Sequence, residues 1–402
     1  MPNGFNGKIL RVDQRRPQKR SFSRMNEKII IKAAPFGMDL GFNIYYLAVP
    51  LLLIQLKATP VELGLVGTIT SSVHMAMSHF MGHLSDRLGR RRLIIAGPVI
   101  FAASCLIVPL VGRIGVILAL SALNGLALSI YWPSLEAWVA DRQTGSELAR
   151  NIGSFNLSWT AATLIGPVLS GFLYNFYPRL TFLFAAAVAL TLFVLIYASL
   201  QETRSYSVES VEIGDGEAST PRKDLLYAVW VANFASWFLI GNARYQFPKL
   251  ARELGLPPYV IGLLIGCLGL SLFSGFFVLR GTHLWHFKKR YLFGAQILAA
   301  LGLVFLSLFS EPVLFALAFL MMGLSCSVTY YSSLYYTVHL LEKKGKGTGL
   351  HESILGIGAV LGPILGGIAA QYNGLRAPYL LCFAVLFAAV VAELTLIKKK
   401  SI

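Results

Sequence analysis

The sequence predicts an all-α integral membrane protein with twelve transmembrane helices in two six-helix halves. Three observations lead to this prediction. Of the 402 residues, 55% are hydrophobic and only 13% are charged, a composition typical of membrane proteins. Apolar runs long enough to cross a bilayer, about 20 residues each, recur along the chain. One long polar segment separates the sixth run from the seventh.

The twelve predicted spans fall into two groups of six. Residues 1–28 are basic and polar and lack an apolar core, so we expect a disordered cytoplasmic tail rather than a signal peptide. The segment 201–223 is rich in Ser, Glu, Asp and Gly and predicts a flexible linker. The halves are then residues 29–200 and residues 224–402. The spans are 33–55, 59–82, 93–112, 115–139, 150–175, 180–200, 224–246, 257–280, 291–310, 313–339, 347–371 and 376–397.

The two halves resemble each other in sequence. Residues 125–134 of the fourth span align with residues 323–332 of the tenth, and residues 166–171 of the fifth align with residues 362–367 of the eleventh. Parallel repeats of this kind predict a central site where the two halves meet. We expect the small residues and prolines of the second pair of segments to pack helices closely. They are Gly166, Pro167, Gly171, Gly362, Pro363, Gly366 and Gly367.

The distribution of Lys and Arg predicts the orientation in the membrane. If the N-terminus is cytoplasmic, 28 of the 35 Lys and Arg residues fall on the cytoplasmic side. Both termini are therefore expected in the cytoplasm, with the protein in the plasma or inner membrane. The net charge of +16 lies in short segments between apolar runs, so the expected partner is the lipid bilayer and not nucleic acid.

The chain shows no pattern of an enzyme or a metal site. All four cysteines lie inside apolar runs, which argues against a disulfide framework and a metal centre. Motifs of the HExxH, GxSxG and Walker types are absent from the sequence, so neither hydrolytic chemistry nor intrinsic ATP drive is expected. We expect a monomer without a cofactor.

Between the second and third spans lies a charged segment, Gly82 to Arg92. Gly82 is expected to let two helix ends approach closely, and Gly89 to permit a tight reversal. Asp86 supplies an anion at the edge of the membrane. Arg87 and the run that begins at Arg90 would hold the segment at an anionic, water-facing surface.

This segment resembles the loop between helices two and three of the major facilitator superfamily, whose pattern is Gly-x-Leu-x-Asp-Arg-x-Gly-Arg-Arg/Lys. The resemblance implies a secondary transporter that works by alternating access, with spans one, four, seven and ten around a central cavity. It also implies a conformational latch, in which the segment bridges to the start of span eleven and to the acids Glu136 and Asp141 that close span four. The matching residues are Gly82, Leu84, Asp86, Arg87, Gly89, Arg90 and Arg91.

Polar and aromatic residues of the cavity-lining spans are the expected solute contacts. Asp39, Asn43 and Tyr46 share one face of span one. Asp39 lies seven residues beyond Lys32, about 10 Å along the helix axis, where an ionised carboxylate without a partner is costly. It should therefore titrate on solute binding or pair with a cation. The other expected cavity residues are Trp132, Asn233, Trp237 and Tyr330.

A second acid, Glu352, has two possible roles. It could couple protons, or it could interact with the dipole at the start of span eleven. The arginine that many proton-coupled members of the superfamily carry four residues before a glycine in span four is absent, because Ser121 precedes Gly125. If protons are coupled, Asp39 or Glu352 must couple them. Arg244 in span seven could anchor the helix at the interface or act on the solute.

These residues predict proton-coupled efflux of small amphipathic or drug-like solutes, because an aromatic-walled cavity suits bulky apolar or cationic molecules. Two alternatives remain open. One is uptake or facilitated diffusion of a small nutrient. The other is a membrane receptor or scaffold that does not transport.

Overall fold

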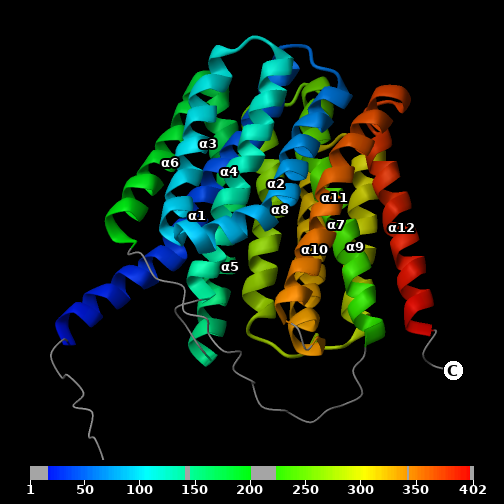
Figure 1. Cartoon of the computed structure of the whole chain (residues 1–402). Coiled ribbons are helices and arrows are strands. Elements are labelled where there is room, and N and C mark those ends of the chain that lie inside the picture. Colours follow the sequence, from blue (N-terminus) through cyan, green and yellow to red (C-terminus); the bar gives the residue numbers. More distant parts are fainter. Residues whose placement is uncertain (1–16, 141–144, 201–222, 342–343, 399–402) are drawn as a thin grey trace, which may run out of the picture.

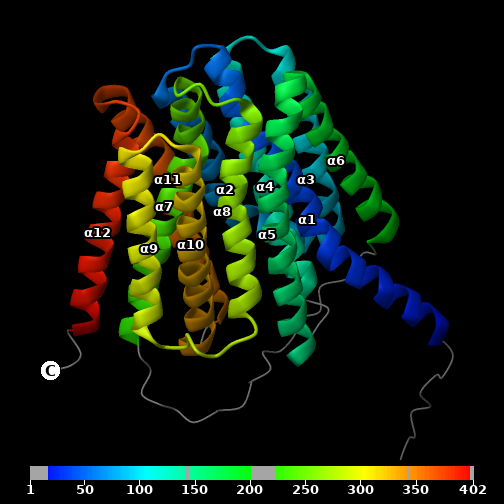
Figure 2. The same cartoon turned by 180° about the vertical axis from the view of Figure 1, so that it is seen from behind.

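The computed structural model describes the backbone of residues 17–140, 145–200, 223–341 and 344–398, and the side chains of 29–139, 153–200, 223–341 and 347–397 (Figures 1 and 2). In this part of the chain all regular structure is helical. The twelve α-helices and one short 3-10 helix, η1, are α1 (Pro17–Gln55), α2 (Pro60–Leu88), α3 (Arg90–Ile107), η1 (Val108–Leu110), α4 (Ile114–Ala140), α5 (Gly145–Phe176), α6 (Pro178–Ser199), α7 (Lys223–Glu253), α8 (Pro258–Leu279), α9 (Lys289–Leu308), α10 (Pro312–Leu340), α11 (Lys344–Asn373) and α12 (Ala377–Lys398).

The helices form two bundles with the same internal packing. In the first half α1 packs on α5 and α6, and α4 packs on α2 and α3. The second half repeats this arrangement six helices later, with α7 on α11 and α12 and α10 on α8 and α9. The halves meet where α5 contacts α8 and where α2 contacts α11. The predicted pair of six-helix halves is confirmed.

The apolar character of the helices suits a membrane environment. Eleven described helices are long and apolar enough to cross a bilayer, and the remaining long helix, α2, carries more Ser, Thr and His. Burial differs between helices. In α7, 78% of the most apolar stretch is buried, but in α12 only 28% is. The protein is therefore a multi-pass membrane protein with α7 enclosed and α12 peripheral.

Local signals set the helix boundaries. At the start of α2, Thr59 and Glu62 form a capping box, with Thr59 N donating to Glu62 Oε2 at 2.7 Å, and Pro60 occupies the first helical position. Gly89, with φ of 94°, makes the turn between α2 and α3. The predicted turn glycine of the charged segment thus has the backbone conformation expected of it.

Two predicted boundaries differ from the structure. Helix α1 begins at Pro17, so the backbone of residues 17–28 is helical, whereas a disordered tail was predicted up to residue 28. Helix α2 continues to Leu88, six residues beyond its predicted end. The charged segment is therefore the last turns of α2, one turn residue and the first turn of α3. Apolar length alone missed these extensions because a helix can continue past the bilayer into water.

The two halves are in close contact on one side of the membrane. We call the face where α1 begins and α12 ends the terminal face, and the opposite one the distal face (Figure 1). Near the distal face a Cβ on Gly64 of α2 would collide with the carbonyl oxygen of Pro363 of α11. A Cβ on Gly171 of α5 would lie 2.5 Å from the carbonyl oxygen of Pro258. The backbones of the two halves thus touch near the distal face.

Polar side chains of α7 complete the contact at the distal face. Lys249 Nζ donates to the carbonyl oxygen of Ala58 at 3.1 Å, and Gln246 Nε2 donates to that of Pro60 at 3.1 Å. Thr68 of α2 donates to the carbonyl oxygen of Val360 at 2.8 Å. These bonds hold the second half to the turn between α1 and α2 and to the adjoining part of α2.

Helices α2 and α11 separate toward the terminal face. Gly82 lies 18 residues after Gly64, which is five helical turns, so both are on the same face of α2. Between them, Met75 contacts Gly356 only through its side chain. A Cβ on Gly82 would meet no described atom within 4 Å. The close helix approach predicted at Gly82 is therefore wrong for this arrangement, because α2 and α11 diverge before reaching it.

The close backbone contact at Gly64 provides a test of the closed distal face. Gly64→Ala should destabilise the distally closed arrangement by about 1–3 kcal/mol, because the new methyl group overpacks a backbone contact. A cysteine at Ala58, which is 1% exposed, should then react with an impermeant maleimide. Gly294→Ala on α9, where a Cβ meets no described atom within 4 Å, is the matched control. Equal labelling in both variants would contradict the proposed closure.

Candidate functional site

Aromatic side chains from both halves meet around Tyr330 of α10. Its ring centroid lies 5.9 Å from Trp159 of α5, 6.4 Å from Trp237 of α7, 5.4 Å from Phe276 of α8 and 5.1 Å from His351 of α11. Trp159 and Phe276 also touch directly across the interface of the halves, at 5.6 Å. We call these five residues the aromatic cluster. Its walls therefore belong to elements that must move relative to one another if the halves rock.

Asp39 of α1 lies next to this cluster. Thr163 Oγ1 of α5 is 3.4 Å from Asp39 Oδ2 and donates to the carbonyl oxygen of Trp159 at 3.1 Å. Because Thr163 and Trp159 are four residues apart, they share one face of α5. The Asp39 carboxyl group is thus about one helical turn from the aromatic cluster.

A cation of the second half completes this region. The guanidinium of Arg244 on α7 lies 5.2 Å from the ring centroid of Tyr46 and interacts electrostatically with the Asp39 carboxyl group. The Tyr46 ring also meets Tyr245 edge to face at 6.3 Å. Arg244 therefore faces the first half and does not serve only as an anchor at the membrane interface.

His351 and Glu352 extend the site toward the terminal face. The buried His351 ring shares a hydrogen bond of 2.7 Å between Nδ1 and Ser333 Oγ, and its Nε2 is 3.7 Å from Glu352 Oε1. The Glu352 side chain is 54% exposed. Helix α11 begins at Lys344, so Glu352 is two turns inside the helix. The helix-dipole explanation for Glu352 is therefore wrong, because that effect is confined to the first turn.

Five of the seven predicted cavity residues lie outside the aromatic cluster, and two of these, Asp39 and Tyr46, still lie at the interface of the halves. Asn43 is 3% exposed, donates to the carbonyl oxygen of Asp39 at 2.9 Å and packs against Gly166 of α5. Trp132 contacts Tyr131 and Phe155 within the first half. Asn233 is fully buried. Asp39, Tyr46, Trp237 and Tyr330 are the predicted residues that the structure brings to the interface of the halves.

The glycines and prolines predicted to pack helices lie at helix crossings. Within the first half Gly166 meets Asn43, and within the second Gly362 meets the backbone of Phe238 and Gly366 meets Asn242. The others lie between the halves. Gly171 and Pro167 face Gly262 and its neighbours, Gly367 faces Pro60, and Pro363 faces Gly64.

The charged segment binds within its own half. Asp86 Oδ1 is 3.2 Å from Arg90 Nη2, one turn apart, and Arg91 Nη2 donates to the carbonyl oxygen of Tyr197 on α6 at 2.8 Å. Arg87 and Glu136 are exposed. Asp141 lies outside the described residues. The predicted bridge from this segment to α11 is absent among the described contacts, as expected where α2 and α11 diverge.

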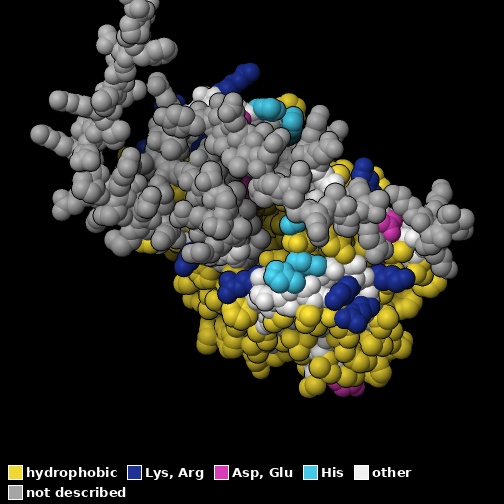
Figure 3. All heavy atoms as spheres, turned by 90° about the horizontal axis from the view of Figure 1, so that it is seen from below, with side chains coloured by type: hydrophobic (Ala, Val, Ile, Leu, Met, Phe, Trp, Pro, Cys, Tyr) yellow, Lys and Arg dark blue, Asp and Glu magenta, His cyan; other side chains and the backbone are white. Residues whose placement is uncertain are grey.

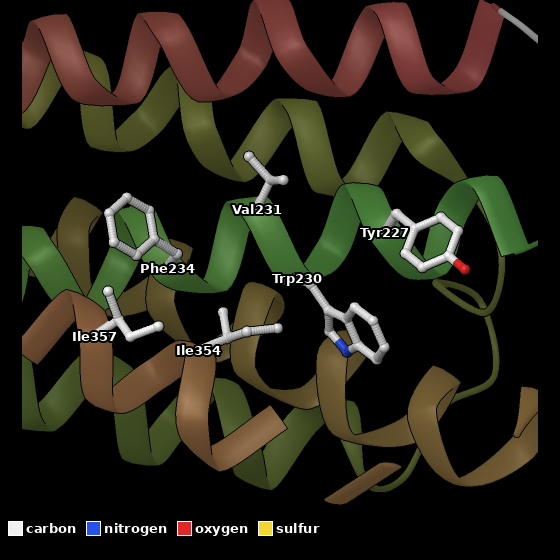
Figure 4. A pocket seen from close by; sticks show the side chains of 6 residues that line it. All are labelled: Tyr227, Trp230, Val231, Phe234, Ile354 and Ile357. Carbon is white, nitrogen blue, oxygen red and sulfur yellow. The ribbon is translucent and has the colours of Figure 1, made fainter. Parts of the chain in front are cut away.

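An apolar groove of about 330 Å³ lies between α7 and α11 (Figure 4). Helices α7 and α11 are in backbone contact at Gly358 and Phe234, and the groove begins there. Its lining is mostly aliphatic and aromatic, and Trp230 Nε1 already donates to Thr337 Oγ1 at 2.9 Å, so the groove suits hydrocarbon. The lining residues are Tyr227, Trp230, Val231, Phe234, Ile354 and Ile357.

The terminal face of the second half carries a group of histidines, flanked by Lys and Arg side chains (Figure 3). His283 and His286 are 4.9 Å apart between ring centroids, and both His286 and His339 stack on Tyr335. Burial, with the nearby charges of His283 and His339, lowers the pKa of His286. In the part of the chain with described side chains, no group of three His, Cys, Asp or Glu residues is arranged to hold a metal ion.

Several residues of the site were not predicted from the sequence. Trp159, Thr163 and Phe276 lie on α5 and α8, which were not expected to line the cavity. Trp159 and Thr163 could have been predicted from the sequence, since they are polar or amphipathic residues on one face of an apolar span. Gln246 also went unnoticed, although a buried amide in a span requires a partner.

The chain matches the family model of the Major Facilitator Superfamily over residues 33–349 and 229–401. Among curated relatives, Multidrug resistance protein 2 of Bacillus subtilis (strain 168) is 26% identical over 53% of each chain. Quinolone resistance protein NorA of Staphylococcus aureus is 25% identical over 42% of this chain and 44% of its own. The chain thus spans about half the length of the curated relatives it matches.

Solved structures share the fold at low sequence identity. A bacterial homologue of the human lysosomal transporter Spinster, inward-facing and occupied, gives a TM-score of 0.74 at 14% identity and covers 93% of this chain and 97% of its own. The nucleoside transporter NupG gives 0.70 at 12% identity, covering 92% and 99%. With a family match over most of its length and this fold, the chain belongs to the Major Facilitator Superfamily and is a transporter, not an enzyme.

Proposed function

We propose that this transporter exports small amphipathic or drug-like solutes in exchange for protons. The observation that carries the proposal is the position of Asp39, one helical turn from the aromatic cluster and at the interface of the two halves. Aromatic rings bind flat apolar surfaces and organic cations, and a carboxylate beside them binds a positive charge. Such a site suits amphipathic cations.

The same site supports proton coupling through Thr163. Its hydroxyl group has one hydrogen and two acceptors within reach, Asp39 Oδ2 and the carbonyl oxygen of Trp159. When Asp39 is protonated, the acid donates to Thr163 Oγ1 and Thr163 donates to Trp159. When Asp39 is ionised, Thr163 turns toward it. The protonation state of Asp39 is thus linked to α5, which lies at the interface of the halves.

Alternating access follows from the divergence of α2 and α11. The distal face is closed by backbone contacts at Gly64 and by the bonds of Gln246 and Lys249, while Gly82 is uncovered. Rocking of the halves would open the distal contacts and bring Gly82 against α11. The charged segment with Asp86, Arg87 and Arg90 would then form the latch that stabilises the outward-facing state, with Glu136 as one of its acids.

The orientation is proposed from the charge distribution. Because most Lys and Arg residues belong to segments that the sequence predicts on the same side as the termini, we propose that the terminal face and both termini are cytoplasmic, with the protein in a plasma or inner membrane. The described arrangement is then inward-facing. Efflux is further supported by the relatives named for multidrug and quinolone resistance.

One observation favours a second candidate function. Arg244 places a cation beside Asp39 and Tyr46, which suits a solute with an anionic group, and the structural relatives include a nucleoside transporter and an organic anion transporter. Uptake or facilitated diffusion of a small nutrient is therefore the alternative. A solute panel with cationic and anionic members distinguishes the two.

Coupling is tested with purified protein in liposomes. An imposed proton gradient should drive uphill flux of a cationic dye, and Asp39→Asn should abolish that flux, because an amide cannot exchange a proton, while leaving the melting temperature near that of the wild type. Glu253→Gln, at the exposed end of α7, is the control. Facilitated diffusion is supported instead if only a concentration gradient of the dye drives flux.

The second acid is tested separately. If Glu352 takes part in proton transfer through His351, Glu352→Gln should shift the pH at which flux is half-maximal without removing solute binding. Binding is measured by quenching of tryptophan fluorescence. An unchanged pH profile of flux would leave Asp39 as the coupling residue and Glu352 as a solvent-exposed side chain.

The latch has its own test. Asp86→Ala should lower the transport rate for every solute by a similar factor, because it removes the 3.2 Å ion pair with Arg90 and weakens one conformation of the cycle. The relative rates across a solute panel measure this. A changed order of solute preference would show that the segment acts on the solute and not on the conformation.

A further inference from the structure

Glu393 is a buried acid far from the proposed solute site. It is the one acidic residue of α12, a helix whose most apolar stretch has a mean hydropathy of 2.6, and its side chain is 0% exposed. It lies five residues before the end of α12 at Lys398, about 7.5 Å along the axis, and within the apolar span Ala377–Ile397. The neighbouring positions on the same buried face are Tyr379, Cys382, Leu386, Ala389 and Ile397.

The partner of Glu393 is an amide. Gln296 of α9 is 2% exposed, and its Nε2 donates to Glu393 Oε1 at 2.6 Å. The two remaining polar atoms, Glu393 Oε2 and Gln296 Oε1, are buried and have no hydrogen-bond partner among the described residues. No described lysine or arginine forms an ion pair with Glu393. An ionised carboxylate here would leave two buried acceptors unsatisfied and a charge without a counter-ion.

We propose that Glu393 is a proton-binding site that carries a resident proton, as a neutral carboxylic acid paired with Gln296. The acid group then donates from Oε2 to Gln296 Oε1 while Gln296 Nε2 donates to Oε1, so that both unpartnered atoms are satisfied by one proton. A buried polar pair is most stable when all of its members are bonded, because each buried polar group without a hydrogen bond keeps an uncompensated desolvation cost. The pair fastens α12 to α9 within an otherwise apolar interface.

This proton does not take part in transport. Helices α9 and α12 both belong to the second half and pack against each other, so rocking of the halves leaves their interface intact. The main contacts between the halves are made by other helices, namely α5 with α8, α2 with α11, and α7 with α1 and α2. The site is therefore distinct from Asp39 and Glu352, and its occupancy stays the same throughout the transport cycle.

Carbodiimide labelling of the whole protein tests the protonation state. A protonated carboxyl group adds across a C=N bond of dicyclohexylcarbodiimide and rearranges to an N-acylurea without a leaving group, so the peptide gains the full mass of the reagent. At neutral pH in liposomes this apolar reagent should label Glu393, while a water-soluble carbodiimide should label the exposed Glu253 and spare Glu393. Reaction of Glu393 with neither reagent, at a pH that leaves the fold intact, would overturn the proposal.

Three variants separate a resident proton from an ionised or exchanging acid. Glu393→Gln should keep the melting temperature and the proton-driven flux, because an amide pair preserves two hydrogen bonds. Glu393→Ala should lower the melting temperature, since it leaves a cavity and the Gln296 amide unpartnered. Replacing both residues by Leu should recover part of that loss. A Glu393→Gln variant as unstable as Glu393→Ala would indicate an ionised acid. A stable Glu393→Gln variant that has lost proton-driven flux would indicate that Glu393 exchanges its proton during transport. Either result overturns the proposal.

Discussion

The backbone contacts of α2 with α11 and of α5 with α8 near the distal face are the constraint on which the rest of the structure depends. Glycine at positions 64, 171 and 367 lets main chains of opposite halves approach to distances at which a side chain would collide. In a bilayer, where lipid is as apolar as the helices, such close packing and hydrogen bonding hold helices together. These contacts hold the halves together near the distal face, and from there α2 and α11 diverge toward the terminal face.

Polar groups inside the membrane have different roles according to where they lie relative to these contacts. Gln246 and Lys249 bond to main-chain carbonyls and close the distal face. Asp39 of the first half and Arg244 of the second interact electrostatically, and the proposed motion of the halves would change their environment. Glu393 lies away from the interface and pairs with an amide of its own half. Acids near the interface of the halves are therefore proposed to couple protons, whereas Glu393, away from that interface, is proposed to have a structural role.

The fold could be predicted from the sequence because the bilayer restricts the spanning element to helices of about 20 apolar residues. The internal repeat and the Gly82 to Arg92 segment supplied the topology. Asp39, Tyr46, Trp237 and Tyr330 were predicted because polar and aromatic residues are rare in apolar spans. Trp159 and Phe276 were missed because their role depends on how α5 crosses α8. The arrangement at Gly82 could not be predicted, because the proposed transport cycle has two conformations and the same sequence forms both.

The central claim is that opening at one face accompanies closing at the other. Pairs of spin labels test it most directly, one pair at Lys57 and Leu254 on the distal face and one at Leu88 and Leu284 on the terminal face, all exposed. On addition of a solute that raises the melting temperature, or on acidification, the distal distance should increase while the terminal distance decreases. Two distances that stay fixed, or that change in the same direction, would contradict alternating access and favour a receptor or scaffold.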